Sequence, residues 1–185
     1  MPALATRTPE DGLLGALAPL GLALAAPGPV LVVDLDEHGP RYPGEASLAR
    51  LVAEEPRAAD LRPGRSGVAV LRNGGIGYAA AARVIEALLA GWDRVVLRLP
   101  PRGVSPVPVP VVPVRLLVPG RFFTHPEGPA VYQATPIPMR VPGPGIRVPV
   151  PARSTVAALL RGTAPPEWDR WVRAWRGAWE APWGR

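Results

Sequence analysis

Two carboxylates follow the most apolar short run in the chain. The run, residues 30–33, has four aliphatic residues without alternation, which predicts a strand buried on both faces of a parallel sheet. Asp34 and Asp36 come directly after it. Ligands of open parallel sheets bind beyond the carboxyl ends of the strands, so these two carboxylates could hold Mg²⁺. The alternative is a pair of solvated turn acids, one of them capping the turn or paired with Arg41.

A glycine-rich loop is the second candidate site. Gly74, Gly75 and Gly77 lie between a predicted strand at 68–71 and a predicted helix that begins at Tyr78. Their backbone N–H groups could hold a phosphate at the helix N-terminus, or the cofactor of an enzyme on a Rossmann-like sheet. The spacing matches neither the dinucleotide nor the P-loop motif, and Asp93 is in a turn rather than at a strand end. A tight strand-to-helix turn is therefore the alternative.

The residue types exclude several other chemistries. The chain has no cysteine, which excludes disulfides, thiolate catalysis and cysteine-bound zinc. Its two histidines, His38 and His125, do not have the spacing of a metal site, and no serine lies in a nucleophile elbow. We therefore expect no metal ligands and no catalytic residue among them.

The C-terminal tail combines tryptophan and arginine. Trp168, Trp171, Trp175 and Trp179 are spaced to share one face of an amphipathic helix over 165–185, with these arginines interleaved: Arg170, Arg173 and Arg176. This combination suits a protein partner, a membrane interface or nucleic acid. The alternative is a terminal helix that packs its tryptophans on the sheet and turns its arginines outward.

Residues 12–33 carry no charge, so a membrane span or an export segment has to be considered. Pro19, Pro27 and Pro29 interrupt the segment. We favour a helix from about Pro9 to Ala25 with Thr8 as N-cap, then a turn and the strand. Residues 1–10 are predicted to be a frayed lead-in.

The remaining pattern predicts a parallel α/β sheet of Rossmann-like or P-loop-like type, flanked by helices. A helix is expected over 47–54, strands over 68–71 and 95–99, and a helix over 78–90 between them. A Pro-rich part follows, with a strand at 111–118, an edge strand and loops at 130–133 and 146–150, and a helix from Ser154 or Thr155 to Arg161. The expected divisions are an α/β core at 1–103, a Pro-rich part at 104–164 that completes the same domain, and the tail helix at 165–185.

Charge is distributed unevenly along the chain. Residues 1–60 have four Arg against nine Asp and Glu, a net charge of −5, and residues 61–185 have seventeen Arg against six acids, a net charge of +11. All 21 basic residues are arginine. The C-terminal part could therefore bind nucleic acid or an anionic membrane, or the two parts could attract each other or a partner.

The order of these segments resembles the ParA/MinD class of deviant P-loop ATPases, including the CpaE-like branch of pilus-localisation proteins. The resemblance covers about residues 10–100. GLLGALAPLGLALAAPGPVLVVDLD is similar to the helix after the P-loop and the strand with its D-x-D ending, and SLARLVAEE to the next short helix. SGVAVLRNGGI and AARVIEALLAGWDRVVLRLP are similar to a strand with its glycine phrase and to the helix and Walker B strand.

The departures from that family imply lost catalysis. The family requires lysines in a glycine-rich loop, and this chain has no lysine. Arg98 replaces the Walker B acid, and an arginine cannot coordinate Mg²⁺. The first strand of the family is also expected to be missing, so that residues 104–118 or a partner chain would fill its place.

The sequence thus predicts a non-catalytic ParA/MinD-like protein, an interaction or scaffolding partner in a bacterial localisation or pilus-assembly system. Asp34, Asp36 and the three loop glycines would be a vestigial nucleotide and Mg²⁺ site, with no cofactor and no small-molecule substrate. A protein partner or a second copy is expected, in the cytoplasm or at the membrane periphery. The alternative is a basic protein that associates with a membrane or nucleic acid through its Arg/Trp-rich C-terminal part.

Overall fold

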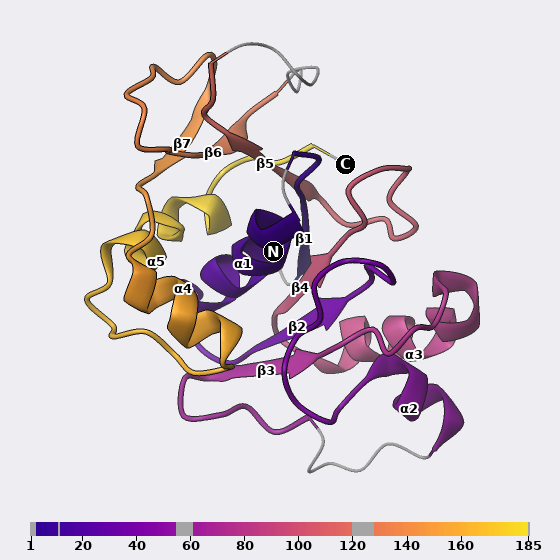
Figure 1. Ribbon diagram of the computed structural model, residues 1–185. Helices are drawn as coiled ribbons and strands as arrows, with labels where there is room; N and C mark the ends of the chain where they lie inside the picture. The colour runs from indigo at the N-terminus through magenta and orange to yellow at the C-terminus, as the bar shows by residue number, and fades with distance from the viewer. Residues whose placement is uncertain (1–2, 11, 55–60, 120–127, 185) are drawn as a thin grey trace.

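The computed structural model describes residues 3–10, 12–54, 61–119 and 128–184 (Figure 1). Seven parallel strands form one sheet in the order β3-β2-β4-β1-β5-β6-β7. The strands are β1 (Ala3–Arg7), β2 (Val30–Asp34), β3 (Val68–Leu71), β4 (Val95–Arg98), β5 (Val111–Leu116), β6 (Ala130–Gln133) and β7 (Gly145–Val148). The helices are α1 (Gly12–Leu24), α2 (Leu48–Ala53), α3 (Tyr78–Gly91), α4 (Arg153–Leu160), α5 (Arg170–Ala174) and the 3₁₀ helix η2 (Arg176–Trp179). The predicted parallel α/β fold is confirmed.

The prediction for the first ten residues is wrong. Ala3–Arg7 is not a frayed lead-in but β1, in the interior of the sheet between β4 and β5. Leu4 and Ala5 are fully buried there. No other segment has to fill this position, and residues 111–116 form the adjacent strand β5. Helix α1 then begins at Gly12 among the described residues, so Thr8 is not its N-cap.

Helices cover the two faces of the sheet separately. In Figure 1, α1, α4 and α5 lie on one side and α2 and α3 on the other. Alternate strand residues divide accordingly: Val30 and Val32 pack in the cluster that includes α1, whereas Leu31 and Val33 pack in the cluster that includes α2 and α3. Strand β2 is therefore buried on both faces, which is why its sequence does not alternate.

Helix α1 is covered on two sides, by the sheet and by an outer layer of α4, α5 and η2. Nearly all its residues from Leu14 to Ala23 are buried. A helix without a solvent-facing side needs no polar stripe, so the uncharged segment 12–33 is a core helix followed by a core strand. No helix in the described ranges has the length and apolar character needed to cross a membrane.

The predicted single tail helix is wrong. Asp169 begins α5 by accepting hydrogen bonds from the N–H groups of Trp171 and Val172, and the helix is only five residues long. The 3₁₀ helix η2 follows, with Gly177 inside it. Glycine disfavours an α-helix, and the short segments let the tail follow the surface of α1.

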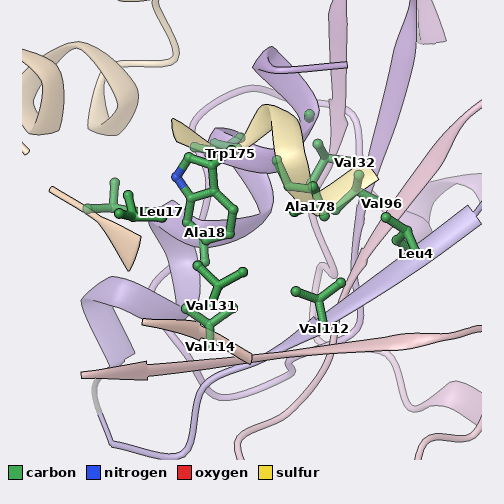
Figure 2. Packing of buried hydrophobic residues seen from close by; sticks show 14 of the residues in the cluster. Leu4, Leu17, Ala18, Val32, Val96, Val112, Val114, Val131, Trp175 and Ala178 are labelled. Atoms are coloured by element: carbon green, nitrogen blue, oxygen red, sulfur yellow. The ribbon is translucent and has the colours of Figure 1, made fainter. Parts of the chain in front are cut away.

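The tail nevertheless belongs to the core. Trp171, Trp175 and Trp183 are buried, and the Trp175 ring lies near Leu17 and Ala18 and above Val131 and Val114 in Figure 2. Trp171 donates from Nε1 to Gln133 Oε1 at 2.7 Å, and Trp179 donates to the carbonyl of Leu22. The alternative of a tail packed inward is therefore the better description.

Two further expectations concern the Pro-rich part, and the second needs correction. Both short apolar segments are strands: β7 (Gly145–Val148) is the edge strand, and β6 (Ala130–Gln133) pairs with β5 and β7 on its two sides. Ser154 and Thr155 lie inside α4, which begins after Ala152. By contrast, Ser47 caps α2 as predicted, since its hydroxyl accepts a hydrogen bond from the N–H of Arg50.

Candidate functional site

The carboxyl ends of β2 and β4 bring Asp34, Asp36 and Arg98 together. Asp34 and Arg98 are opposite each other in the parallel register. The Arg98 guanidinium reaches Asp34 Oδ2 from Nη1 at 3.3 Å and Asp36 Oδ2 from Nη2 at 2.8 Å. The three side chains are 2–9% exposed. The position that would hold a metal ion is thus filled by a side chain of the protein itself.

Every carboxylate oxygen of the two aspartates accepts a hydrogen bond. Asp34 Oδ1 accepts from the N–H of Asp36, and Asp36 Oδ1 accepts from the N–H groups of His38 and Gly39. Both Oδ2 atoms accept from Arg98. No oxygen is left without a donor, so a metal ion would have to displace the guanidinium. The described residues contain no group of three metal-ligating side chains elsewhere either.

The loop after Asp36 closes over the guanidinium. Arg98 Nη1 also donates to the carbonyl of Pro40 at 2.6 Å, and its guanidinium carbon lies 5.5 Å from the centroid of the Tyr42 ring. Tyr42 donates its hydroxyl hydrogen to the carbonyl of Ala16 in α1. A Cβ at Gly39 would overlap the Arg98 guanidinium and the Asp36 carboxylate, so glycine is required there. The sequence did not predict these contacts of Gly39, Pro40 and Tyr42 with Arg98.

The buried cluster has an excess of one negative charge, because two carboxylates share one guanidinium. Burial raises the pKa of Asp34 to about 6, although Arg98 and the backbone N–H of Asp36 oppose the rise. Burial also raises the pKa of Tyr42, which keeps its hydroxyl neutral as a donor.

The glycine loop lies beside Asp34, but the side chain of Asn73 in the same loop occupies its N–H groups. Gly74 and Gly75 have positive φ, 81° and 85°, which accounts for these glycines. Asn73 Oδ1 accepts the N–H groups of Gly75 and Ile76 at 2.8 and 2.9 Å, so these donors are not available to a phosphate. Gly77 is the residue before α3. The geometry is that of a tight turn.

The tail residues do not lie together on one surface. Trp171 and Trp175 are in the core and cannot contact a partner, Trp179 is half-buried, and Trp168 is 74% exposed before α5 begins. The three tail arginines are exposed and line a cavity of about 670 Å³ with Arg147 of β7. His125 lies outside the described residues, and His38 contributes its backbone N–H to the aspartate loop.

Arg7, which the sequence did not indicate, lines another cavity of about 590 Å³ beside β5 and the Pro-rich segment. Its Nε and Nη2 atoms are buried and have no hydrogen-bond partner in the structure as described. Burial lowers the pKa of this guanidinium.

Replacing Arg7 with methionine is expected to raise the free energy of unfolding by about 1 kcal/mol, because donors buried without a partner cost free energy that an apolar side chain avoids. Urea unfolding followed by tryptophan fluorescence measures this change. Arg83→Met, at an exposed position, is the control and should have no effect. A loss of stability in Arg7→Met would instead show that the guanidinium has a partner.

No protein-family model matches the chain, and no curated protein matches it.

Proposed function

We propose that this chain is a non-catalytic ParA/MinD-like protein that acts as an interaction or scaffolding partner. The observation that carries the proposal is the Arg98 guanidinium bound to both Asp34 and Asp36. In a magnesium-dependent nucleotide site these carboxylates would face the metal ion and the phosphates. In this protein both carboxylates instead form ion pairs with the Arg98 guanidinium.

Arg98 opposes nucleotide chemistry in two ways. It occupies the carboxylate oxygens, and its positive charge repels Mg²⁺. It is also held by the Pro40 carbonyl and the Tyr42 ring, so displacing it would break several contacts at once. The chain has no lysine to stabilise a transferred phosphoryl group, and the glycine loop uses the N–H groups of Gly75 and Ile76 internally.

The same contacts give the aspartate loop a structural role. Arg98 joins β4 to the loop after β2, and Tyr42 joins that loop to α1. A fixed loop at the carboxyl edge of the sheet presents a pre-organised surface, on which a partner would bind with little ordering cost. A retained nucleotide-binding fold would thus serve as a scaffold.

The test is calorimetric titration with ATP in the presence and absence of Mg²⁺, with phosphate release assayed on the same sample. We expect no turnover and no binding that depends on Mg²⁺. The control is Asp34→Ala, which should behave like the wild type in both assays. Turnover or Mg²⁺-dependent ATP binding that disappears in Asp34→Ala would contradict the proposal, because the carboxylates would then be working ligands.

A further inference from the structure

Four arginines converge on the cavity of about 670 Å³ at the carboxyl ends of β6 and β7. They are Arg147, Arg170, Arg173 and Arg176. Within the described part of the chain, none of the four lies within 4 Å of a carboxylate oxygen. No acidic residue lines the cavity either. Four like charges around one cavity repel one another, so an anion bound between them is favoured, most of all at low salt.

The local structure explains why the arginines share this side. Arg170, Arg173 and Arg176 are three residues apart in α5 and the adjoining 3₁₀ helix, so they form one row. The buried side of the same segments holds Trp171, Trp175 and Ala178. Since these rings fix the segments on α1, the arginine row has a fixed place beside β7, which α5 contacts.

The size and the lining of the cavity limit the ligand. Its volume is in the usual range for small-molecule sites. The remaining lining residues are small or aliphatic: Ala134, Thr135, Pro149, Val150 and Ala174. No aromatic ring among them offers the stacking on which single-stranded nucleic acid depends.

We propose that this cavity, here called the arginine cavity, binds a compact ligand with several phosphate groups. Guanidinium groups bind phosphate oxygens through paired N–H donors, and four of them match an oligophosphate rather than a single anion. The site is separate from the aspartate cluster and needs no metal ion. It therefore does not depend on whether the proposed scaffold function is correct.

The probe is inorganic tripolyphosphate, titrated by calorimetry at low salt with EDTA present. The variant Arg170→Gln/Arg173→Gln/Arg176→Gln removes three charges from the arginine cavity. The control variant Arg65→Gln/Arg83→Gln/Arg102→Gln removes three charges from exposed positions elsewhere. We expect the first variant to lose at least about 20-fold in affinity, and the control less than about threefold. Asp34→Ala should bind as the wild type does, which separates this test from the ATP experiment.

Folding is checked by the melting temperature, which tripolyphosphate should raise in the wild type and in the control but not in the cavity variant. Three results would overturn the inference. One is no binding by the wild type, and another is an equal loss in both triple variants, which would indicate net charge alone. The third is binding of a single-stranded oligonucleotide or of phosphatidylserine vesicles that needs the three arginines and that tripolyphosphate does not displace.

Discussion

Replacing Arg98 with methionine is expected to lower the free energy of unfolding by about 3–5 kcal/mol, because removing one partner of a buried ion pair leaves uncompensated charge. In this protein two carboxylates, those of Asp34 and Asp36, would lose their ion pair with Arg98, and their side chains are only 3% and 9% exposed. The hydrogen bond to the Pro40 carbonyl and the contact with the Tyr42 ring are lost as well. Urea unfolding, followed by tryptophan fluorescence, measures the change.

Two controls isolate the electrostatic cause. Arg50→Met removes an exposed ion pair with Glu54, and we expect a change below about 1 kcal/mol. The triple variant Arg98→Met/Asp34→Asn/Asp36→Asn removes the buried charges together and should recover part of the stability lost in Arg98→Met. If Arg98→Met alone were as stable as the wild type, the guanidinium would not be what holds the two aspartates, and the proposed scaffold role of this loop would lose its basis.

Replacing Gly21 with alanine is expected to lower the free energy of unfolding by about 3 kcal/mol, at the upper end of the usual cost of overpacking. A Cβ at this position would be 2.6 Å from Trp171 Cη2 and from Trp175 Nε1. Both rings are buried, with their centroids 5.5 Å apart at an angle of 70°, so neither can move aside freely. Without the tail, α1 would keep only α4 as outer cover.

Gly15→Ala is the matched control, since Gly15 is in the same helix and a Cβ there would approach only Thr8 Cβ, at 3.9 Å. Alanine is a better helix former than glycine, so this variant should be more stable by up to about 1 kcal/mol. Denaturant unfolding of the two variants should therefore differ in sign. A stabilising effect of Gly21→Ala would mean that the tail does not pack on α1 in this way.

Local sequence was sufficient to predict the elements whose burial follows a regular pattern of apolar residues or a capping signal. The four apolar residues of β2, the capping Ser47 of α2 and the apolar side of α3 each carry their own signal, and all three elements form where they were predicted. Strand β1 was missed because Ala3–Arg7 contains only one large aliphatic residue, Leu4. Its strand conformation comes from pairing with β4 and β5 on both sides.

The candidate site depended more on distant contacts. The sequence indicated Asp34, Asp36 and Arg98 as a departure from a magnesium site, but residues 62–64 positions apart meet only through the parallel register of β2 and β4. The sequence could not show that Arg147 lies at the same cavity as the tail arginines, because a loop and a helix separate β7 from α5 along the chain. No local pattern encodes such a meeting.

The sequence by itself determined the parallel α/β class, the absence of cysteine and lysine chemistry, and the arginine at the end of β4. Tertiary structure decided how the ambiguous segments are used. The uncharged stretch at 12–33 favoured a core helix and strand but left a membrane span open, and the outer layer of α4, α5 and η2 over α1 shows that it is a core helix. Likewise, the tryptophans were compatible with a surface or a core, and their burial on Gly21 follows from the space that a glycine leaves on α1.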